Sequence, residues 1–106
     1  MFLVKFTQEA LDQMESLDKS VAQQVLKKLR WLSENFDDAA HLPLTGALKG
    51  IYKLRAGDYR ALYTFDRNVQ EIVVHAVKHR REVYKTKQSH YQYSNHPQIY
   101  TNLRRI

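Results

Sequence analysis

Hydrophobic positions recur at helical spacing through the first third of the chain. The longest run predicts a helix over residues 19–35, because its apolar side chains return every three or four positions. They are Val21, Ala22, Val25, Leu26, Leu29 and Leu32. A shorter run over residues 10–17 predicts an earlier helix, with Thr7 as its N-cap and Asp18 as the N-cap of the longer one. The link between them is short, so an antiparallel helical hairpin is expected.

Four segments have the short, β-branched and aromatic character of strands. One precedes the helices, at residues 2–6, and three follow them, at residues 51–56, 59–65 and 71–77. The predicted fold class is α+β: an N-terminal strand, a helical hairpin and an antiparallel three-strand meander. Together the strands are expected to form one largely antiparallel sheet with the helices on one face.

Two segments lie outside these elements. Residues 37–50 form a connection interrupted by Pro43, Gly46 and Gly50. Its leucines are expected to pack it against the core: Leu42, Leu44 and Leu48. Residues 85–106 are rich in polar and aromatic side chains. They are expected to be an extension of unknown role, either a loose tail or a short docked element.

The Gly57-Asp58 pair predicts a two-residue hairpin loop, which fixes the register of the strands beside it. Arg55 then lies opposite Arg60, and Lys53 shares their face because side chains alternate along a strand. Like charges placed opposite each other destabilise a sheet by roughly 0.2–1 kcal/mol. Either an anion sits between these cations, or their long side chains spread into solvent. The other face, which the helices are expected to cover, carries Tyr52, Leu54, Tyr59, Ala61, Tyr63 and Phe65.

Composition narrows the classes of function. A chain of 106 residues has room for one core. Without cysteine it has no disulfide and no thiolate nucleophile, and its five histidines lack metal-ligand spacing, so neither a metal nor another cofactor is expected. The longest apolar runs are only a few residues, and the N-terminus lacks the pattern of a secretory signal. A cytoplasmic protein without a membrane partner is therefore expected.

Positive charge is concentrated in the second part of the chain. The net charge of the whole chain is +6. Residues 1–40 hold five Lys or Arg against seven Asp or Glu, whereas residues 41–106 hold twelve against four. A basic segment on a near-neutral scaffold suggests a polyanionic partner, most simply a nucleic acid. The alternative is a basic surface that serves only solubility.

Three stretches together resemble the RelE/ParE superfamily of bacterial toxins. In one-letter code they are KLRAGDYRALY at residues 53–63, IVVHAV at 72–77 and HRREVY at 79–84. Upstream, LTG at residues 44–46 resembles the approach of that family to its first sheet hairpin. The resemblance covers about residues 2–84, so it implies a RelE-like toxin domain over residues 1–84 and leaves residues 85–106 outside.

The resemblance to the RelE branch implies the toxin of a type II toxin-antitoxin system. Such toxins are ribosome-dependent endoribonucleases that cut mRNA in the ribosomal A site and are held inactive by a cognate antitoxin. The implied partners are that antitoxin and the ribosome with its mRNA and rRNA, with operator DNA contacted only through the antitoxin. Two alternatives remain open: a non-enzymatic poison of DNA gyrase, as in the ParE branch, or a basic RNA-binding module without cleavage activity.

The resemblance also implies roles for individual residues. Lys53 matches a catalytic lysine, Arg60 a phosphate-binding arginine, Arg80 a second arginine and Tyr84 a tyrosine that stacks on a base. Some members carry a further lysine two positions before the first, where this chain has Ile51. The missing charge, if one is needed, would then have to come from Lys49, Arg55 or Arg81. The expected RNA-binding residues are Lys49, Arg55, His79 and Arg81.

These residue types suit RNA cleavage by the 2′-hydroxyl of the substrate itself. Preplaced cations can stabilise the extra negative charge on the phosphorane without a metal. Arg60 and Arg80 suit the phosphate, because a guanidinium forks onto two oxygens. Lys53 is the candidate base if neighbouring cations favour its neutral amine, and Tyr84 could stack on a base. Structural roles remain the alternative for Tyr84 and His79, and are expected for His75.

Overall fold

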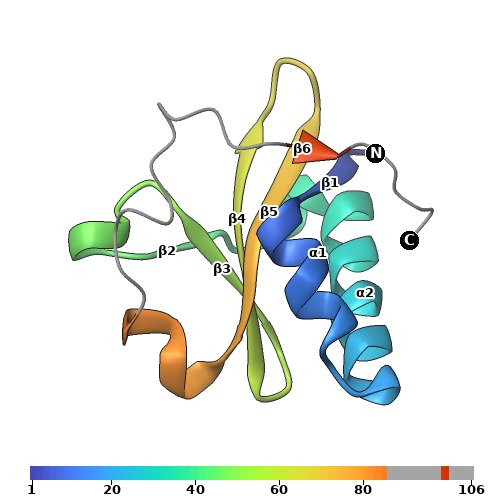
Figure 1. The fold of residues 1–106 in the computed structure, drawn as a ribbon. Coiled ribbons are helices and arrows are strands. Elements are labelled where there is room, and N and C mark those ends of the chain that lie inside the picture. The colour runs from blue at the N-terminus through green and yellow to red at the C-terminus, as the bar shows by residue number, and fades with distance from the viewer. Residues whose placement is uncertain (86–98, 101–106) are drawn as a thin grey trace.

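A computed structural model describes the backbone of residues 1–85 and 99–100 and the side chains of residues 1–83 (Figure 1). The predicted extension at residues 85–106 therefore lies outside the described residues, apart from the backbone at 85 and at 99–100. Within the described part, no helix is long and apolar enough to cross a membrane.

The elements follow the predicted order and confirm the α+β fold class. The helices are α1 (Gln8–Glu15) and α2 (Lys19–Glu34). The strands are β1 (Leu3–Thr7), β2 (Leu42–Pro43), β3 (Tyr52–Ala56), β4 (Tyr59–Asp66), β5 (Glu71–His79) and β6 (Ile99–Tyr100). Three short 3₁₀ segments join them: η1 (Phe36–Asp38), η2 (Gly46–Leu48) and η3 (Arg80–Lys85).

The predicted helical hairpin is present, with α1 and α2 running side by side in opposite directions (Figure 1). Thr7 caps α1 as expected, since its hydroxyl accepts a hydrogen bond from the Ala10 N–H at 3.2 Å. Asp18 occupies the N-cap position of α2, but its side chain makes no capping hydrogen bond. The prediction is thus right about where α2 begins and wrong about how its first turn is satisfied.

The strands form one sheet in the order β2-β3-β4-β5-β1-β6. All neighbouring pairs are antiparallel except β1 and β5, which are parallel. A parallel pair needs a long crossover. Here it includes both helices, which brings the N-terminal strand beside the last strand of the meander. The edge strand β2 lies in the segment that the sequence predicts to be only a connection.

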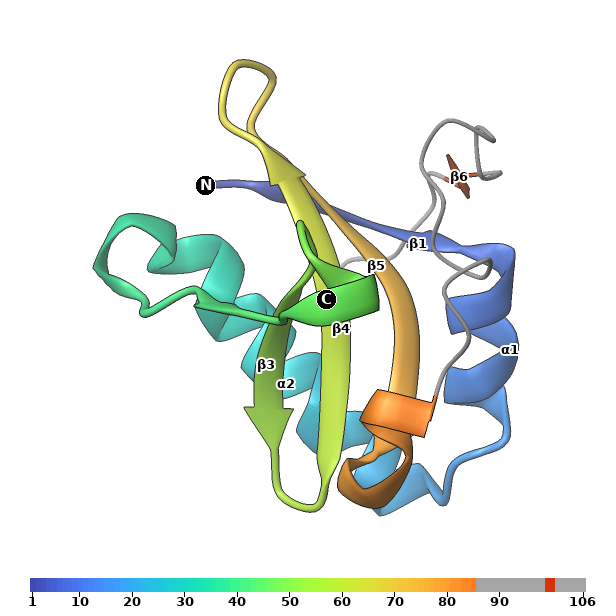
Figure 2. The same cartoon turned by 90° about the vertical axis from the view of Figure 1, so that its left-hand side faces the viewer.

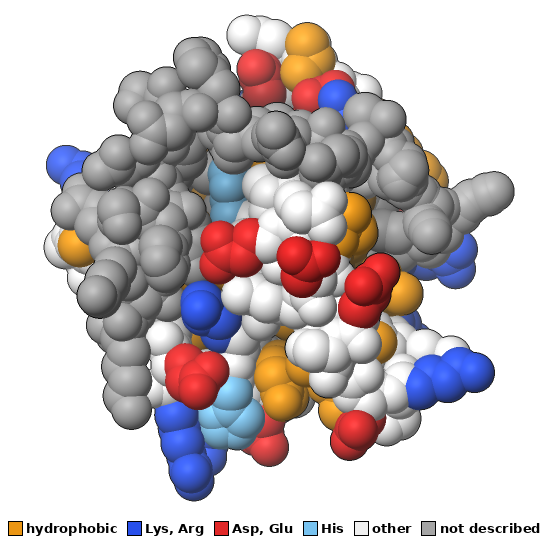
Figure 3. All heavy atoms as spheres, viewed as in Figure 1, with side chains coloured by type: hydrophobic (Ala, Val, Ile, Leu, Met, Phe, Trp, Pro, Cys, Tyr) orange, Lys and Arg blue, Asp and Glu red, His pale blue; other side chains and the backbone are white. Residues whose placement is uncertain are grey.

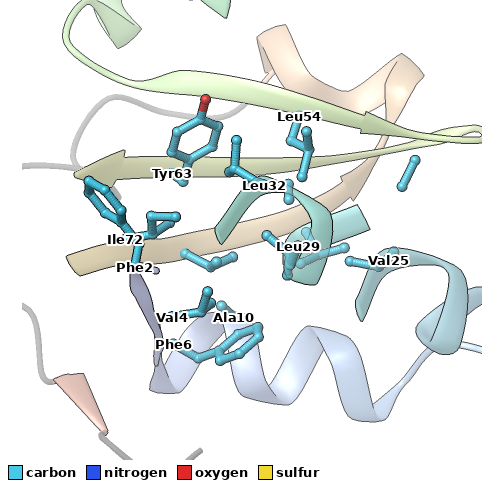
Figure 4. Packing of buried hydrophobic residues seen from close by; sticks show 14 of the residues in the cluster. Phe2, Val4, Phe6, Ala10, Val25, Leu29, Leu32, Leu54, Tyr63 and Ile72 are labelled. Carbon is cyan, nitrogen blue, oxygen red and sulfur yellow. The ribbon is translucent and has the colours of Figure 1, made fainter. Parts of the chain in front are cut away.

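The main core lies between the helices and one face of the sheet (Figure 4). Val25, Leu29 and Leu32 of α2 are fully buried there, against Val4 and Phe6 of β1. The strands β3 and β4 turn toward the helices the face that the hairpin register predicts. Its buried residues in the main core include Leu54, Ala61 and Tyr63. Figure 4 shows these side chains converging from α2, β1 and the central strands.

A second, smaller core lies on the opposite face. Figure 2 shows α2 behind the sheet and the segments η2 and η3 in front of it. The buried residues of this small core come from the sheet, from those two segments and from the chain on either side of η2: Leu44, Leu48, Ile51, Leu62, Ala76 and Val83. Leu44 and Leu48 therefore hold the connection down as predicted, but they do so on the face away from the helices. Leu42 is 48% exposed, so its predicted packing is wrong.

A β-bulge separates the two ends of the β4–β5 pair. Leu62 pairs with Ala76, but the next residue, Tyr63, pairs with Val74, so β5 has an extra residue at His75. The His75 side chain is buried, and its Nε2 lies 2.9 Å from the Thr64 hydroxyl. Burial lowers the pKa of His75 to about 4. This histidine is therefore neutral inside the sheet, in agreement with the structural role expected for it.

Candidate RNA-binding and cleavage site

Three cations lie in one row across three strands. Arg55 of β3 pairs with Arg60 of β4, as the hairpin register predicts, and Arg60 in turn pairs with Lys78 of β5. Adjacent strands are about 4.8 Å apart, so the three side chains leave the same face as close neighbours. Sequence reasoning missed Lys78 as a site residue. Simple pairing from the turn between β4 and β5 would place Val77 opposite Arg60, and the register shift beyond Tyr63 places Lys78 there instead.

Arg60 is the best-positioned side chain of this row. Its Nη1 donates hydrogen bonds to the Gly57 carbonyl at 3.0 Å and to the Tyr59 carbonyl at 2.9 Å. Gly57 has φ +61°, a left-handed conformation that glycine adopts without strain. The pKa of Arg60 is lowered by its partial burial and then by the positive charges of Arg55 and Arg80. The turn thus holds a guanidinium where other cations already crowd, which is a place where an anion is favoured.

Arg80 joins this group through the turn between β3 and β4. Its backbone N–H donates to the Asp58 carbonyl at 2.8 Å, and its Nε lies 3.9 Å from an Asp58 carboxylate oxygen. Both side chains are more than half exposed, so this ion pair is a weak contact that an incoming phosphate could replace. Figures 1 and 2 both show η3 beside the β3–β4 turn. The structure therefore brings Arg60 and Arg80 together.

Lys53 lies on the same face as the row, two positions before Arg55 along β3. At about 3.4 Å per residue it is about 7 Å from the row. Lys53 pairs with Leu62 and is half-buried. Because Leu62 belongs to the small core, Lys53 lies at the border between that core and the cationic row.

The remaining predicted residues have different positions. Arg81 is exposed on η3, next to Arg80, whereas Lys49 is exposed just after η2, four positions before Lys53. The backbone of Tyr84 is part of η3, and its side chain lies outside the described residues. The structure therefore keeps Arg81 close to the group and leaves Lys49 in the connecting segment.

His79 lies on the other face of the sheet. It pairs with Tyr59, and the two rings form an edge contact with centroids 5.4 Å apart. Tyr59 packs against the main core, so His79 points away from the side of Arg60. The Arg81 backbone N–H donates to His79 Nδ1 at 3.2 Å. The neutral ring therefore carries its proton on Nε2.

Figure 3 shows Lys, Arg and His side chains at the lower left, at the end of the sheet where η3 lies. Acidic side chains lie beside them and across the middle of the same view. Among the described residues, no group of three or more His, Asp or Glu is placed to hold a metal ion. The arrangement can hold a phosphate between several guanidinium and ammonium groups.

A family model for the ParE toxin of type II toxin-antitoxin systems matches residues 4–84. This match covers both hairpins of the meander and the cationic row.

The chain belongs to the RelE/ParE toxin superfamily.

A putative RelE-like toxin protein of Escherichia coli is 37% identical to it, over 58% of this chain and 65% of that relative. The match thus spans slightly less than two thirds of the relative's length.

Solved structures of RelE/ParE toxins and their complexes have the same fold. A chain of the RelBE2 toxin-antitoxin complex of Mycobacterium tuberculosis superposes with a TM-score of 0.66 at 28% identity, over 74% of this chain and 96% of that one. The isolated RelE toxin of Escherichia coli superposes with a TM-score of 0.61 at 29% identity, over 80% of this chain and 93% of that one. These similarities agree with the predicted RelE-like architecture.

Proposed function

We propose that this protein is a toxin that cleaves mRNA in the ribosomal A site, through attack of the substrate's own 2′-hydroxyl on the adjacent phosphorus. The observation that carries the proposal is the position of Arg60. The turn carbonyls hold it between Arg55 and Lys78, with Arg80 close by. A structural protein gains nothing from this repulsion, whereas a phosphate that becomes more negative during the reaction relieves it.

The residues divide the chemistry between them. Arg60 and Arg80 contact the non-bridging phosphate oxygens, whose charge grows as the 2′-oxygen attacks. Lys53 removes the proton from the 2′-hydroxyl, and Tyr84 stacks on a neighbouring base and keeps the nucleotide in line. The bond to the 5′-oxygen then breaks, that oxygen takes up a proton, and a 2′,3′-cyclic phosphate remains. Lys78, Arg55 and Arg81 add to the positive field around the phosphate.

The partner that controls this activity is a cognate antitoxin. Two observations support it: the family model is of type II toxin-antitoxin systems, and similar structures include RelB–RelE complexes. We expect the antitoxin to cover the cationic row with acidic side chains, or to displace the η3 segment that carries Arg80 and Tyr84. Either mode of binding would prevent Arg80 from contacting the substrate phosphate. The toxin and its ribosomal target would meet in the cytoplasm.

The second candidate function is poisoning of DNA gyrase without cleavage. The match to a ParE family model favours it. After induction in a bacterial host, primer extension on translated mRNA separates the two. Discrete cuts within codons would support mRNA cleavage. Uncut mRNA together with gyrase-linked DNA damage would overturn that proposal and support the poisoning of gyrase. Ribosome binding with neither effect would instead support a basic RNA-binding module.

The role of each residue is tested by single-turnover cleavage of ribosome-bound mRNA at saturating protein, together with ribosome pelleting. Arg60→Ala is expected to slow cleavage about 10²–10³-fold, as the loss of a preplaced charge donor does. Lys53→Ala is expected to slow it about 10²–10⁴-fold while ribosome binding changes little. Lys19→Ala, an exposed lysine at the start of α2, is the control for charge alone. Near wild-type cleavage by Lys53→Ala would show that Lys53 is a binding residue and not the base.

A further inference from the structure

One stripe of α2 carries polar and aromatic side chains beside its buried stripe. Gln24, Lys27, Lys28 and Trp31 are spaced at i, i+3, i+4 and i+7, so they follow one another along one side of the helix. The residues that α2 buries in the main core are others, among them Val25, Leu29 and Leu32. The stripe is therefore available on the surface, next to the β3–β4 turn.

A hollow of about 450 Å³ lies between this stripe and the hairpin. Its lining residues come from both elements: Gln24, Lys27, Lys28, Arg55, Ala56 and Gly57. Three of them are cations, and none is acidic. The volume is within the roughly 300–1,000 Å³ of sites that take small organic ligands. A group larger than a single phosphate, with negative charge, fits these properties.

An aromatic surface lies next to the hollow. The Lys28 Nζ is 5.3 Å from the centre of the Trp31 ring, and Trp31 is 43% exposed. An indole with an ammonium at its face can stack on a nucleobase while the cation meets the backbone phosphate. A nucleotide chain would use both features at once, its phosphates meeting the cations and one of its bases the exposed indole. The combination therefore favours a nucleotide chain.

Arg55 connects the hollow with the cationic row. It lines the hollow beside Lys27 and Lys28, and it also pairs with Arg60 across the β3–β4 hairpin. A single polyanion could therefore contact the lysines of α2, then Arg55 at the edge of the sheet, and then Arg60.

We propose that the hollow and Trp31 form a second RNA-binding site, separate from the cleavage centre. Lys27 and Lys28 bind backbone phosphates there, and Trp31 stacks on one unpaired base. The assignment to RNA, as opposed to another polyanion, rests on the proposed function. The site would hold a single-stranded or looped segment adjoining the phosphate that Arg60 contacts, and would so increase affinity without taking part in the chemical step.

The test is the affinity for a short single-stranded oligoribonucleotide with 2′-O-methyl groups, which the protein cannot cleave, measured by fluorescence anisotropy at several salt concentrations. Each phosphate contact on a single strand contributes about 0.7 to the slope of log affinity against log salt. Lys27→Gln with Lys28→Gln is expected to reduce that slope by about 1.4. Trp31→Ala is expected to weaken binding about 5- to 150-fold with little change in slope.

Lys19→Gln is the matched control, because Lys19 is exposed on the same helix and does not line the hollow. If the Lys27 and Lys28 substitutions change affinity no more than Lys19→Gln does, the second site does not exist. A polyglutamate peptide that binds equally well and is weakened by the same substitutions, Trp31→Ala included, would overturn the assignment to RNA. Either result would overturn only the second site. If Arg60→Ala still strongly slows cleavage of ribosome-bound mRNA, the proposed function is unaffected.

Discussion

The two faces of the sheet use alternate positions of the same strands for different purposes. The face toward the helices buries a large continuous core, with Leu29 and Tyr63 fully enclosed. The opposite face buries only a small cluster around Leu62, covered by η2 and η3 instead of α-helices. Around that cluster lie Lys53 and the row of Arg55, Arg60 and Lys78.

This difference shows where the molecule can accommodate unfavourable contacts. Like charges placed opposite each other cost roughly 0.2–1 kcal/mol per pair. Full burial of one leucine or valine contributes about 1.5–3 kcal/mol. A few buried side chains on the helix-covered face therefore outweigh the repulsion on the other. We infer that stability resides mainly on the first face and chemistry on the second.

The largest expected effect concerns the helix-covered face. Leu29→Ala is expected to lower the free energy of unfolding by about 2–5 kcal/mol, because it leaves a cavity in the centre of the main core. Urea denaturation followed by circular dichroism measures this loss. Arg55→Ala, on the other face, is expected to leave stability unchanged or to raise it by up to about 1 kcal/mol, since it removes one charge of a repelling pair. A large loss for Arg55→Ala would contradict the comparison.

The sequence predicts well which residues lie on the helix-covered face and which on the cationic face, because the two patterns that decide this are local. Residues three and four apart define the buried stripe of α2, and the Gly57-Asp58 turn fixes which residues share a face of β3 and β4. The parallel pairing of β1 with β5 joins residues such as Leu3 and Glu71, which are far apart along the chain. No local pattern contains that information, and the same holds for the edge strand β2.

The next prediction concerns the histidine buried at the bulge. The pKa of His75 falls from 6.5 to about 4 because burial disfavours its charged form. Between these two pH values the unfolded chain binds the proton and the folded chain does not, so stability rises with pH. At 1.36 kcal/mol per pKa unit the rise is at most about 3 kcal/mol, complete above pH 6.5. Urea denaturation at a series of pH values between 4 and 7 measures it.

His75→Gln separates this contribution from those of the carboxylates. Glutamine can still bond to the Thr64 hydroxyl but does not titrate in this range. The pH dependence of this variant is expected to be flatter than that of the wild type, whereas His79→Gln, at a half-exposed position, serves as the control. Equal slopes for wild type and His75→Gln would show that His75 is not buried in solution as it is in this structure.

The candidate site is less predictable than the fold because it depends on two hairpins and a short 3₁₀ segment at once. The first hairpin places Arg55 opposite Arg60 from sequence alone. Lys78 needs the second hairpin, whose bulge at His75 shifts the register that simple alternation would give. His79 then falls on the face of Tyr59, although it is the next residue after Lys78. The residue types of Lys78 and His79 do not show which of the two lies on the face of Arg60.

Among the core substitutions, the smallest expected loss of stability belongs to the small core, and it makes the sharpest comparison. Val83 of η3 is 1% exposed and Val25 of α2 is fully buried, so each valine is enclosed in one of the two cores. Replacing either with alanine removes two methyl groups, a loss of about 1.6 kcal/mol at about 0.8 kcal/mol per carbon. The loss for Val83→Ala is expected to be no larger than that for Val25→Ala, because η3 is short and can settle into the space.

The two variants should differ in cleavage. Val83 holds η3 against Leu62 and Ala76, so its loss would shift Arg80 relative to Arg60, and a displacement of about 1 Å can cost about 10²-fold in rate. Val25→Ala leaves η3 in place, and its cleavage at saturating protein is expected to match the wild type. Denaturation and single-turnover cleavage on both variants test this. Equal losses of cleavage would show that the site depends on overall stability, and not on the docking of η3 against the small core.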